Sequence, residues 1–346
     1  MTTLYKDIGS TLTDPKLTLN VQKDGLVRAA HAVQFQVFSL IDLRVQVYPE
    51  TEGEKEDAET VETGTYSAVW TATDATSGLY EIRWFLEMDE GDDVAVFFDQ
   101  FDVLDSDFGF DPGYGLVSDL RDEGLTTTQA NDRRCLRALE RASADIDRYT
   151  GRRFLAERKS IRVNGNDGDV LSLGEPVIGL SGITVEGFTR VGSDVEWDVE
   201  LDWLAVYNRH LRGVLNPDDR ENPKIAFRRS EPSVSGDLFP RGTANVLLDG
   251  VFGYTDPSKG NPQGITPKPI RYCAMLLAMR SVFRVGSDDS EDVRNRHLIT
   301  SERTADQSYS RAVPTNKKTV IGDLTGDPEI DSILEAYSRP FDIGAV

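Results

Sequence analysis

The stretch Thr126-Thr-Thr-Gln-Ala-Asn-Asp-Arg-Arg-Cys135, continuing to Arg141-Ala-Ser-Ala-Asp-Ile-Asp-Arg-Tyr-Thr-Gly-Arg-Arg-Phe154, contains the clearest helix signal in the chain. Its apolar side chains recur at alternating steps of four and three, which places one stripe on one helix face: Cys135, Leu139, Ala142, Ile146 and Tyr149. Thr126 with Gln129 fits a capping box, and Thr128 is the alternative cap. Gly151 falls where a helix ends in a left-handed residue. The pattern predicts a long helix that separates two chemically different parts of the chain.

The part of the chain before this helix is typical of a β-rich domain. Apolar and polar side chains alternate over several short runs, among them Val33–Phe38, Leu43–Tyr48 and Leu79–Phe85. About seven short strands separated by turn-like breaks predict an antiparallel β-sandwich over residues 1–105. Residues 106–115 are rich in Gly, Pro and Asp, which is typical of a linker between domains.

The part after the linker, residues 116–346, is expected to contain a helical core with a small inserted β-sheet. A second helix, Ile270–Val285, is apolar nearly all round and is expected to be buried. Residues 287–326 are polar without a core pattern, which predicts a mobile or functional segment. A short last helix is signalled by Asp327 as its cap and by Pro328 at its first position. The sequence therefore predicts an α+β protein of two domains.

The charge of the chain excludes one class of function. The formal net charge is -21, and residues 1–110 carry 22 acidic against 7 basic side chains. Such a surface repels nucleic acid, which is the opposite of what a DNA reader needs. No apolar run is long enough to cross a membrane, and no signal-peptide pattern opens the chain, so we expect synthesis and retention in a cytoplasm. Cys135 and Cys273 lie in apolar helical patterns and are expected to be buried thiols.

No pattern in the sequence points to catalysis. The histidines His31, His210 and His297 have no Cys, Asp or Glu at a spacing typical of a metal site. The acidic group at residues 89–93 could hold calcium, but it lacks the EF-hand spacing and fits a charged hairpin tip better. Nucleophile-elbow, phosphate-loop and dinucleotide-binding motifs are absent from the sequence. We therefore expect no enzymatic activity, no metal and no cofactor.

Four blocks of the sequence, in order, resemble the head-tail connector (adaptor) family of tailed phages over about residues 116–346. They are the helix end Arg148-Tyr-Thr-Gly-Arg-Arg-Phe154, the run Phe239-Pro-Arg-Gly-Thr-Ala-Asn-Val246 with Gly253-Tyr254, the apolar helix from Ile270, and Thr325-Gly-Asp-Pro-Glu-Ile-Asp331 with Leu334 to Pro340. The pair Gly64-Thr-Tyr66 with Trp70 and Gly78-Leu-Tyr80 with Trp84 is similar to immunoglobulin-like modules of virion proteins. Many connectors lack such an N-terminal domain, so its role stays open.

The resemblance implies a structural protein of the virion neck. Copies of the chain would close into a ring, usually dodecameric, which binds the portal and meets tail or neck proteins. DNA would pass through the channel without specific binding, and no membrane would be involved. Before assembly the chain would lie in the host cytoplasm.

The resemblance also suggests which residues meet partners. A closed ring needs two different faces on each subunit, and the arginines at and after the long helix could pair with acids of a neighbour: Arg133, Arg137, Arg141, Arg148, Arg152 and Arg153. A solvated helix face with intrahelical ion pairs is an equal alternative, and contact with DNA phosphates is a third. The partly apolar tail could dock on the portal through Tyr337, Arg339, Pro340, Phe341 and Ile343.

Two other functions remain open at the level of sequence. A surface or receptor-binding protein could bind carbohydrate on an aromatic platform of its sandwich, made of Tyr66, Trp70, Tyr80 and Trp84. Strand aromatics that alternate with polar residues are more often part of a core. A tail-completion protein would share the virion location but dock lower in the neck.

Overall fold

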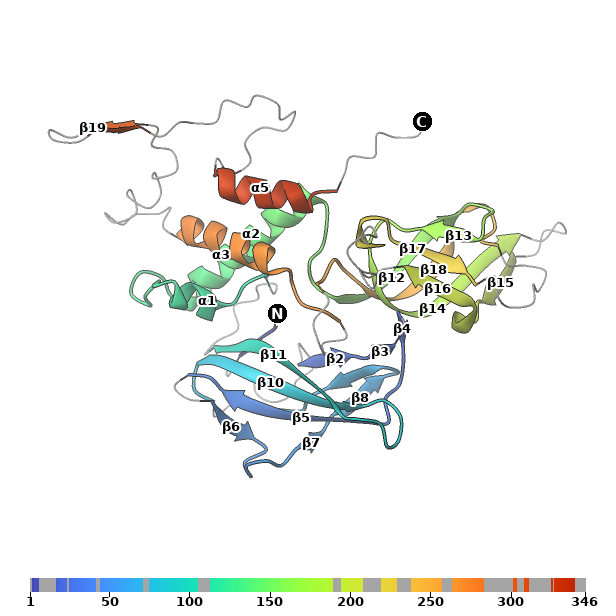
Figure 1. Cartoon of the computed structure of the whole chain (residues 1–346), viewed down its shortest axis with the longest axis horizontal. Helices are drawn as coiled ribbons and strands as arrows, with labels where there is room; N and C mark the ends of the chain where they lie inside the picture. The colour runs from blue at the N-terminus through green and yellow to red at the C-terminus, as the bar shows by residue number, and fades with distance from the viewer. Residues whose placement is uncertain are drawn as a thin grey trace. The chain divides into compact units, whose positions relative to one another are not determined.

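A computed structural model describes most of the chain and divides it into two compact units (Figure 1). The described residues are 2–5, 17–23, 25–41, 44–70, 75–104, 113–188, 194–207, 219–228, 238–256, 263–282, 301–303, 308–310, 325 and 327–339. The first unit is Met1–Asp107 with Arg152–Pro267, and the second is Phe108–Gly151 with Lys268–Val346. The predicted linker lies largely outside the described residues.

The N-terminal part of the first unit is a β-sandwich. Its larger sheet has the order β1 (Thr2–Tyr5), β11 (Ala95–Leu104), β10 (Gly78–Glu87), β5 (Ala32–Ser39) and β6 (Val45–Tyr48), with β7 (Glu56–Asp57) also on β5. Its smaller sheet has the order β2 (Thr18–Asn20), β9 (Thr65–Ser67) and β8 (Glu59–Glu62). The pairs are antiparallel except β1 with β11, which is parallel. Alternate side chains of both sheets fill the layer between them, as the sequence pattern predicted.

The aromatic side chains of the sandwich are core residues. Tyr66, Trp70, Tyr80 and Trp84 are 5%, 9%, 2% and 3% exposed. Trp70 and Tyr80 both pack on Phe101, with ring centroids 5.9 and 5.8 Å away. A carbohydrate platform must expose its ring faces, so these four residues do not form one.

The second half of the first unit is also built from strands. One sheet has the order β12 (Glu157–Gly165), β18 (Gly242–Phe252), β14 (Val177–Phe188), β4 (Leu26–Val27) and β3 (Gln22–Lys23), with β15 (Asp194–Asp198) also on β14. A smaller sheet has the order β13 (Val170–Ser172), β17 (Lys224–Phe227) and β16 (Leu204–Tyr207), near the short helices η1 (Leu201–Trp203) and η2 (Asp219–Glu221). Their apolar side chains share one core.

The N-terminal chain is part of this second sheet as well as of the sandwich. Leu26 of β4 pairs in parallel with Leu180 of β14. Arg158 on β12 forms an ion pair with Glu62 at 2.9 Å and donates to the Thr65 hydroxyl at 2.6 Å. These contacts join the two strand-rich halves into one unit, although more than ninety residues separate Arg158 from Thr65.

The second unit contains the α-helices of the described chain. They are α1 (Val117–Asp122), α2 (Asp132–Thr150), α3 (Lys268–Val282) and α5 (Pro328–Tyr337). The short strands β19 (Ser301–Arg303) and β20 (Ser308–Ser310) pair with each other. Four of the five residues of the predicted α2 stripe are buried, whereas Tyr149 is half-buried. The helix α5 begins at the predicted cap, where Asp327 accepts a hydrogen bond from the Glu329 N–H at 2.8 Å. No helix in the described part of the chain is long and apolar enough to cross a membrane.

The predicted fold class is wrong, because it gave the helices too large a share of the protein and the strands too small a share. The described residues contain twenty strands and only four α-helices, so the protein is mostly strands and a helical connector core with a small β insertion is not seen. The 3.6-residue patterns of the helices are strong in this sequence, and the prediction therefore gave the helices too large a share of the fold. The strands after the long helix were expected to form only a small insertion, whereas β12, β14 and β18 are 9, 12 and 11 residues long and pair in one sheet.

Candidate functional site

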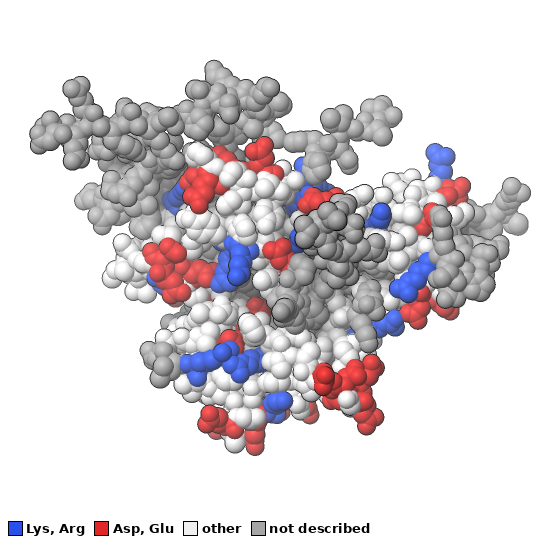
Figure 2. All heavy atoms as spheres, viewed as in Figure 1, with Lys and Arg blue, Asp and Glu red and all other residues white. Residues whose placement is uncertain are grey.

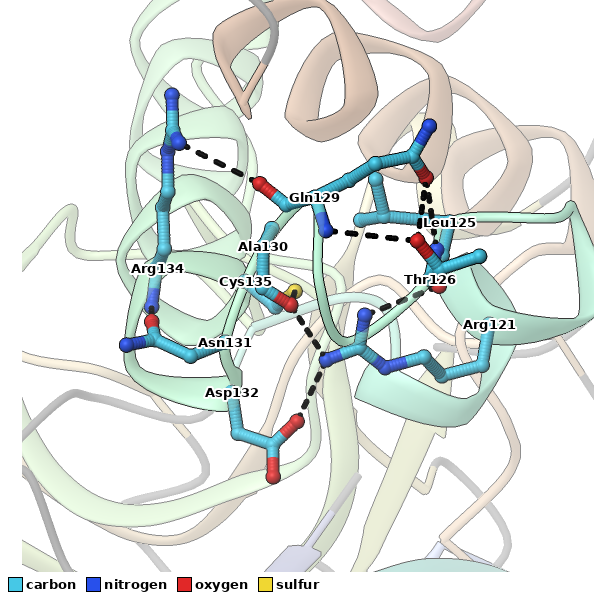
Figure 3. A network of polar contacts seen from close by, with 9 residues as sticks. All are labelled: Arg121, Leu125, Thr126, Gln129, Ala130, Asn131, Asp132, Arg134 and Cys135. Carbon is cyan, nitrogen blue, oxygen red and sulfur yellow. Dashed lines mark hydrogen bonds and ion pairs between the residues drawn. The ribbon is translucent and has the colours of Figure 1, made fainter.

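The helix α2 begins later than the sequence predicted (Figure 3). Its N-cap is Asn131, whose side-chain oxygen accepts from the Arg134 N–H at 3.1 Å. The reciprocal bonds of the predicted capping box are formed, because the Thr126 N–H donates to the Gln129 side chain at 2.9 Å and the Gln129 N–H donates to the Thr126 hydroxyl oxygen at 3.4 Å. These bonds close a turn before the helix, so the predicted caps of α2 at Thr126 and at Thr128 are both wrong.

Arg121 fixes the connection from α1 to α2, as Figure 3 shows. Its guanidinium donates to the carbonyl oxygens of Leu125 and Ala130 at 2.9 and 2.8 Å, and to Asp132 at 2.7 Å. These two carbonyls lie in the turn and are not part of a helix, so the arginine supplies hydrogen bonds that regular structure would otherwise supply. A planar guanidinium presents five N–H donors in a fixed fork, whereas a lysine ammonium is a compact point charge with three donors on a flexible stem, so arginine suits acceptors at these separate positions better. These bonds therefore fix the turn that leads from α1 into the first residues of α2.

The end of α2 is held by the chain after α5. Gly151 has φ 65° and donates its N–H to the Asp147 carbonyl at 2.9 Å, which confirms the predicted left-handed end. The Arg339 N–H donates to the carbonyl of Thr150 at 3.0 Å. Two of the blocks that carry the family resemblance, the end of α2 and the end of α5, therefore meet in the second unit.

Four of the predicted arginines form a continuous surface on α2. Arg133, Arg137, Arg141 and Arg148 are all exposed, and their spacing of four, four and seven residues places them on the side opposite the buried stripe. We name these four residues the arginine stripe. Arg148 lies 3.6 Å from Asp145 of the same helix, and both side chains are largely in solvent. The arginine stripe lies on a rigid element whose two ends are both fixed.

The two central arginines have no ion-pair partner in their own chain. Among the residues that the structure describes, neither Arg137 nor Arg141 forms a hydrogen bond or a salt bridge through its guanidinium. The neighbouring Arg134 differs, because it donates to the Val282 carbonyl at the end of α3. The exposure of Arg137 and Arg141 fits both a contact with another subunit and the alternative of a solvated helix face, and Arg148 does form an intrahelical pair with Asp145.

Arg152 and Arg153 belong to the first unit and are not part of α2. The Arg152 side chain is 4% exposed, and its guanidinium donates to both carboxylate oxygens of Glu221, at 3.2 and 2.5 Å. It also lies 4.5 Å from the centroid of the Tyr254 ring. Arg153 is half-buried, and its carbonyl accepts from the Tyr254 N–H at 2.7 Å. The Arg152 guanidinium is therefore not available to pair with an acid of another subunit.

Tyr254 is the centre of a cluster that sequence reasoning did not find. Arg220 also lies 4.5 Å from its ring centroid, and Phe154 meets the ring edge-on at 5.8 Å. The Tyr254 hydroxyl donates to Glu221 at 2.8 Å. The sequence blocks around residues 152–154 and 253–254 thus meet in space, and an aromatic residue directly after a glycine at a strand end was the only local signal.

The predicted docking tail is described only in part. Tyr337 ends α5 and is half-buried, whereas the Arg339 side chain is exposed. Pro340, Phe341 and Ile343 lie outside the described residues, as does most of the segment 287–326. His210 and His297 lie outside them as well. Within the described ranges, no group of three or more His, Cys, Asp or Glu side chains is arranged to hold a metal ion.

Both cysteines are buried, as predicted. Burial raises the pKa of each thiol, and the carboxylates of Glu329 and Asp327 add to the effect at Cys273, whose pKa rises to about 12. A thiol with a pKa near 12 instead of 9 is ionised about a thousandfold less at pH 8, and only the thiolate is reactive.

We expect the two thiols of the folded protein to resist a disulfide reagent such as DTNB at pH 8 and both to react once urea unfolds the chain. A folded-state pKa above the unfolded value also means that these thiols favour folding at neutral pH and that this contribution is lost as the pH rises above about 9. Fast reaction of either thiol in the native protein would contradict the burial seen here. Absorbance at 412 nm with and without urea measures the difference.

Comparison with known proteins gives a distant likeness to solved structures. No family model matches the chain, and no curated protein matches it. Among solved structures, a chain described as "Neck of empty GTA particle computed with C6 symmetry" matches at 18% identity, over 68% of this chain and 94% of that chain. Its TM-score is 0.36, which does not establish a common fold.

Proposed function

We propose that the chain is a structural protein of the neck of a phage-like particle, where its copies form a ring between portal and tail. Two observations support this. The sequence blocks that resemble the connector family occur in the family's order, and the ends of two of them meet at the Thr150 carbonyl. The arginine stripe supplies an exposed charged surface at a fixed place on a rigid helix. No catalytic role is assigned to any residue.

The observation that carries the proposal is the pair Arg137 and Arg141. Each is exposed and lacks an ion-pair partner among the described residues, in a chain of net charge -21. Two exposed arginines on an otherwise acidic protein attract the acidic surface of another copy. A head-to-tail contact needs two such different, complementary surfaces on each subunit. Contact with DNA phosphates fits less well, because strong phosphate binding would hold DNA that must slide through a channel.

The proposed ring is a dodecamer that docks on the portal through the tail after α5 and meets tail or neck proteins on its other side. The four aromatic residues offered for carbohydrate binding are buried, so no observation favours the receptor-binding alternative. In this proposal the protein folds in the host cytoplasm and ends in the virion neck.

The test is the mass of the purified full chain. We expect native mass spectrometry and negative-stain microscopy to find a closed ring, at least when the portal is present, and the double variant R137E/R141E to shift the population to small species. Reversing two charges at a contact raises the concentration needed for assembly by roughly tenfold or more, because like charges then face each other.

A matched control is R28E/R162E, which makes the same change in net charge at two exposed arginines of the first unit that already have acidic partners. This control should assemble like the wild type. A wild-type chain that stays monomeric even with the portal would overturn the proposal, and so would rings of R137E/R141E at wild-type concentrations.

A further inference from the structure

The second unit has another surface that its own helices leave uncovered, on α3. The buried side of α3 consists of Ile270, Cys273, Ala274, Met275, Ala278 and Val282. Three further large side chains follow one another at steps of four and three on the opposite side: Tyr272, Leu276 and Met279. Tyr272 is 40% exposed, and the other two are only partly buried. We name these three residues the tyrosine stripe.

Acidic side chains border the tyrosine stripe. Glu123 at the end of α1 and Glu329 in the first turn of α5 are both exposed, and neither has an ion-pair partner among the described residues. Both carboxylates lie near the Tyr272 hydroxyl, whose pKa is raised first by burial and then by the negative charges of Glu329 and Glu123. Asp327 is also near but is already bound by Arg280. In Figure 2, acidic side chains gather where α5 and α1 lie in Figure 1.

The arginine stripe and the tyrosine stripe lie on different sides of the same unit. The buried sides of α2 and α3 pack in one core, so the exposed side of each helix faces away from the other. On the arginine stripe, Arg137 and Arg141 have no ion-pair partner among the described residues. Around the tyrosine stripe, Glu123 and Glu329 likewise have none, and the exposed Lys268 lies one turn before Tyr272. Apolar side chains with a polar rim are typical of the centre of a protein interface, and Tyr with Arg contributes most of the binding energy there.

We propose that the arginine stripe of one copy of this chain docks on the tyrosine stripe of the next copy, head to tail. The proposal rests on the proposed function, because it names the partner surface within that ring. Arg137 and Arg141 then meet Glu123 and Glu329, and a guanidinium covers the exposed face of Tyr272. A repeated contact of this kind closes into a ring when the rotation between copies allows it.

Mixing two reversed variants tests the pairing in the full chain. The variant R137E/R141E carries new acids on its arginine stripe and keeps the native acids around its tyrosine stripe. The variant E123R/E329R keeps its arginine stripe and carries new arginines around its tyrosine stripe. Each variant alone should need at least about tenfold more protein to assemble than the wild type. Mixed in equal amounts they should assemble again at wild-type concentrations, because every contact in an alternating ring then joins opposite charges.

Native mass spectrometry should find the two variants in equal numbers in each restored ring, which a chain that fails to fold cannot produce. The variant Y272A should weaken assembly without a change of charge, and E52R/E90R, at two exposed acids of the first unit, should leave it unchanged. If the wild type forms rings and E123R/E329R assembles like it, the proposed pairing of the two stripes is wrong. The same holds if the mixture of variants does not assemble at wild-type concentrations. In both cases the proposed ring itself is not contradicted. If the wild type forms no ring, the proposed function itself fails.

Discussion

Replacing Gly253 with alanine is expected to cost about 3–5 kcal/mol of the free energy of unfolding, a loss at the upper end for single substitutions. Gly253 follows β18 with φ +142°, which an L side chain rarely adopts. A Cβ atom built there would lie 2.1 Å from the carbonyl oxygen of Leu155. Both the conformation and the contact involve backbone, so no side-chain rotation can relieve them.

The loss should spread to the Tyr254 cluster. The Gly253 N–H donates to the Pro176 carbonyl at 2.9 Å, and the Tyr254 N–H donates to the Arg153 carbonyl at 2.7 Å. Separating residues 253 and 155 breaks these bonds and lifts Tyr254 from its two arginines. Urea unfolding followed by circular dichroism measures the effect. The matched control is G174A, where an added Cβ meets nothing within 4 Å, and a change below about 1 kcal/mol is expected there. Equal stability of G253A and G174A would contradict this account.

Replacing Glu221 with alanine is expected to cost about 3 kcal/mol, more than replacing its partner Arg152. The variant E221A leaves the guanidinium, whose side chain is 4% exposed, without a carboxylate, and arginine cannot lose its charge. Glu221 is 43% exposed, so water reaches the site and keeps the cost at the lower end of the range for a broken buried pair. The Tyr254 hydroxyl loses its acceptor as well.

The variant R152M removes the buried charge itself and leaves a carboxylate that water can solvate, so about 1–2 kcal/mol is expected. The control is E186A, which breaks the pair of Glu186 with Arg162, where both side chains are nearly half exposed, and less than 1 kcal/mol is expected. Unfolding curves of the three variants should rank them in this order of loss: E221A, then R152M, then E186A. A larger loss for R152M than for E221A would show that packing on Tyr254, and not charge burial, dominates.

The local patterns of the helices could be recognised in the sequence because their causes are local. The buried stripe of α2, the left-handed Gly151 and the Asp327 cap each follow from residues within a few positions of one another. The cap of α2 was missed because Thr126 and Asn131 are both good capping residues, and Arg121 decides between them by holding the intervening turn.

Charge patterns could place arginines on a helix face but could not show which of them are paired. Arg134 and Arg137 are only three residues apart, yet the first bonds the end of α3 and the second has no partner among the described residues. Arg152 looked like a continuation of the surface series and is buried against Glu221. The difference depends on chain segments more than sixty residues away.

The faces of α2 and α5, the burial of the two thiols and the alternating strands of the sandwich follow from local sequence patterns, because periodicity and capping depend on neighbouring residues. The dominance of strands, the pairing of β4 with β14 and the packing of Tyr254 on Arg152 and Arg220 arise from contacts between distant segments. These contacts bring together segments far apart in the chain, and the path between such segments is not encoded in any local pattern.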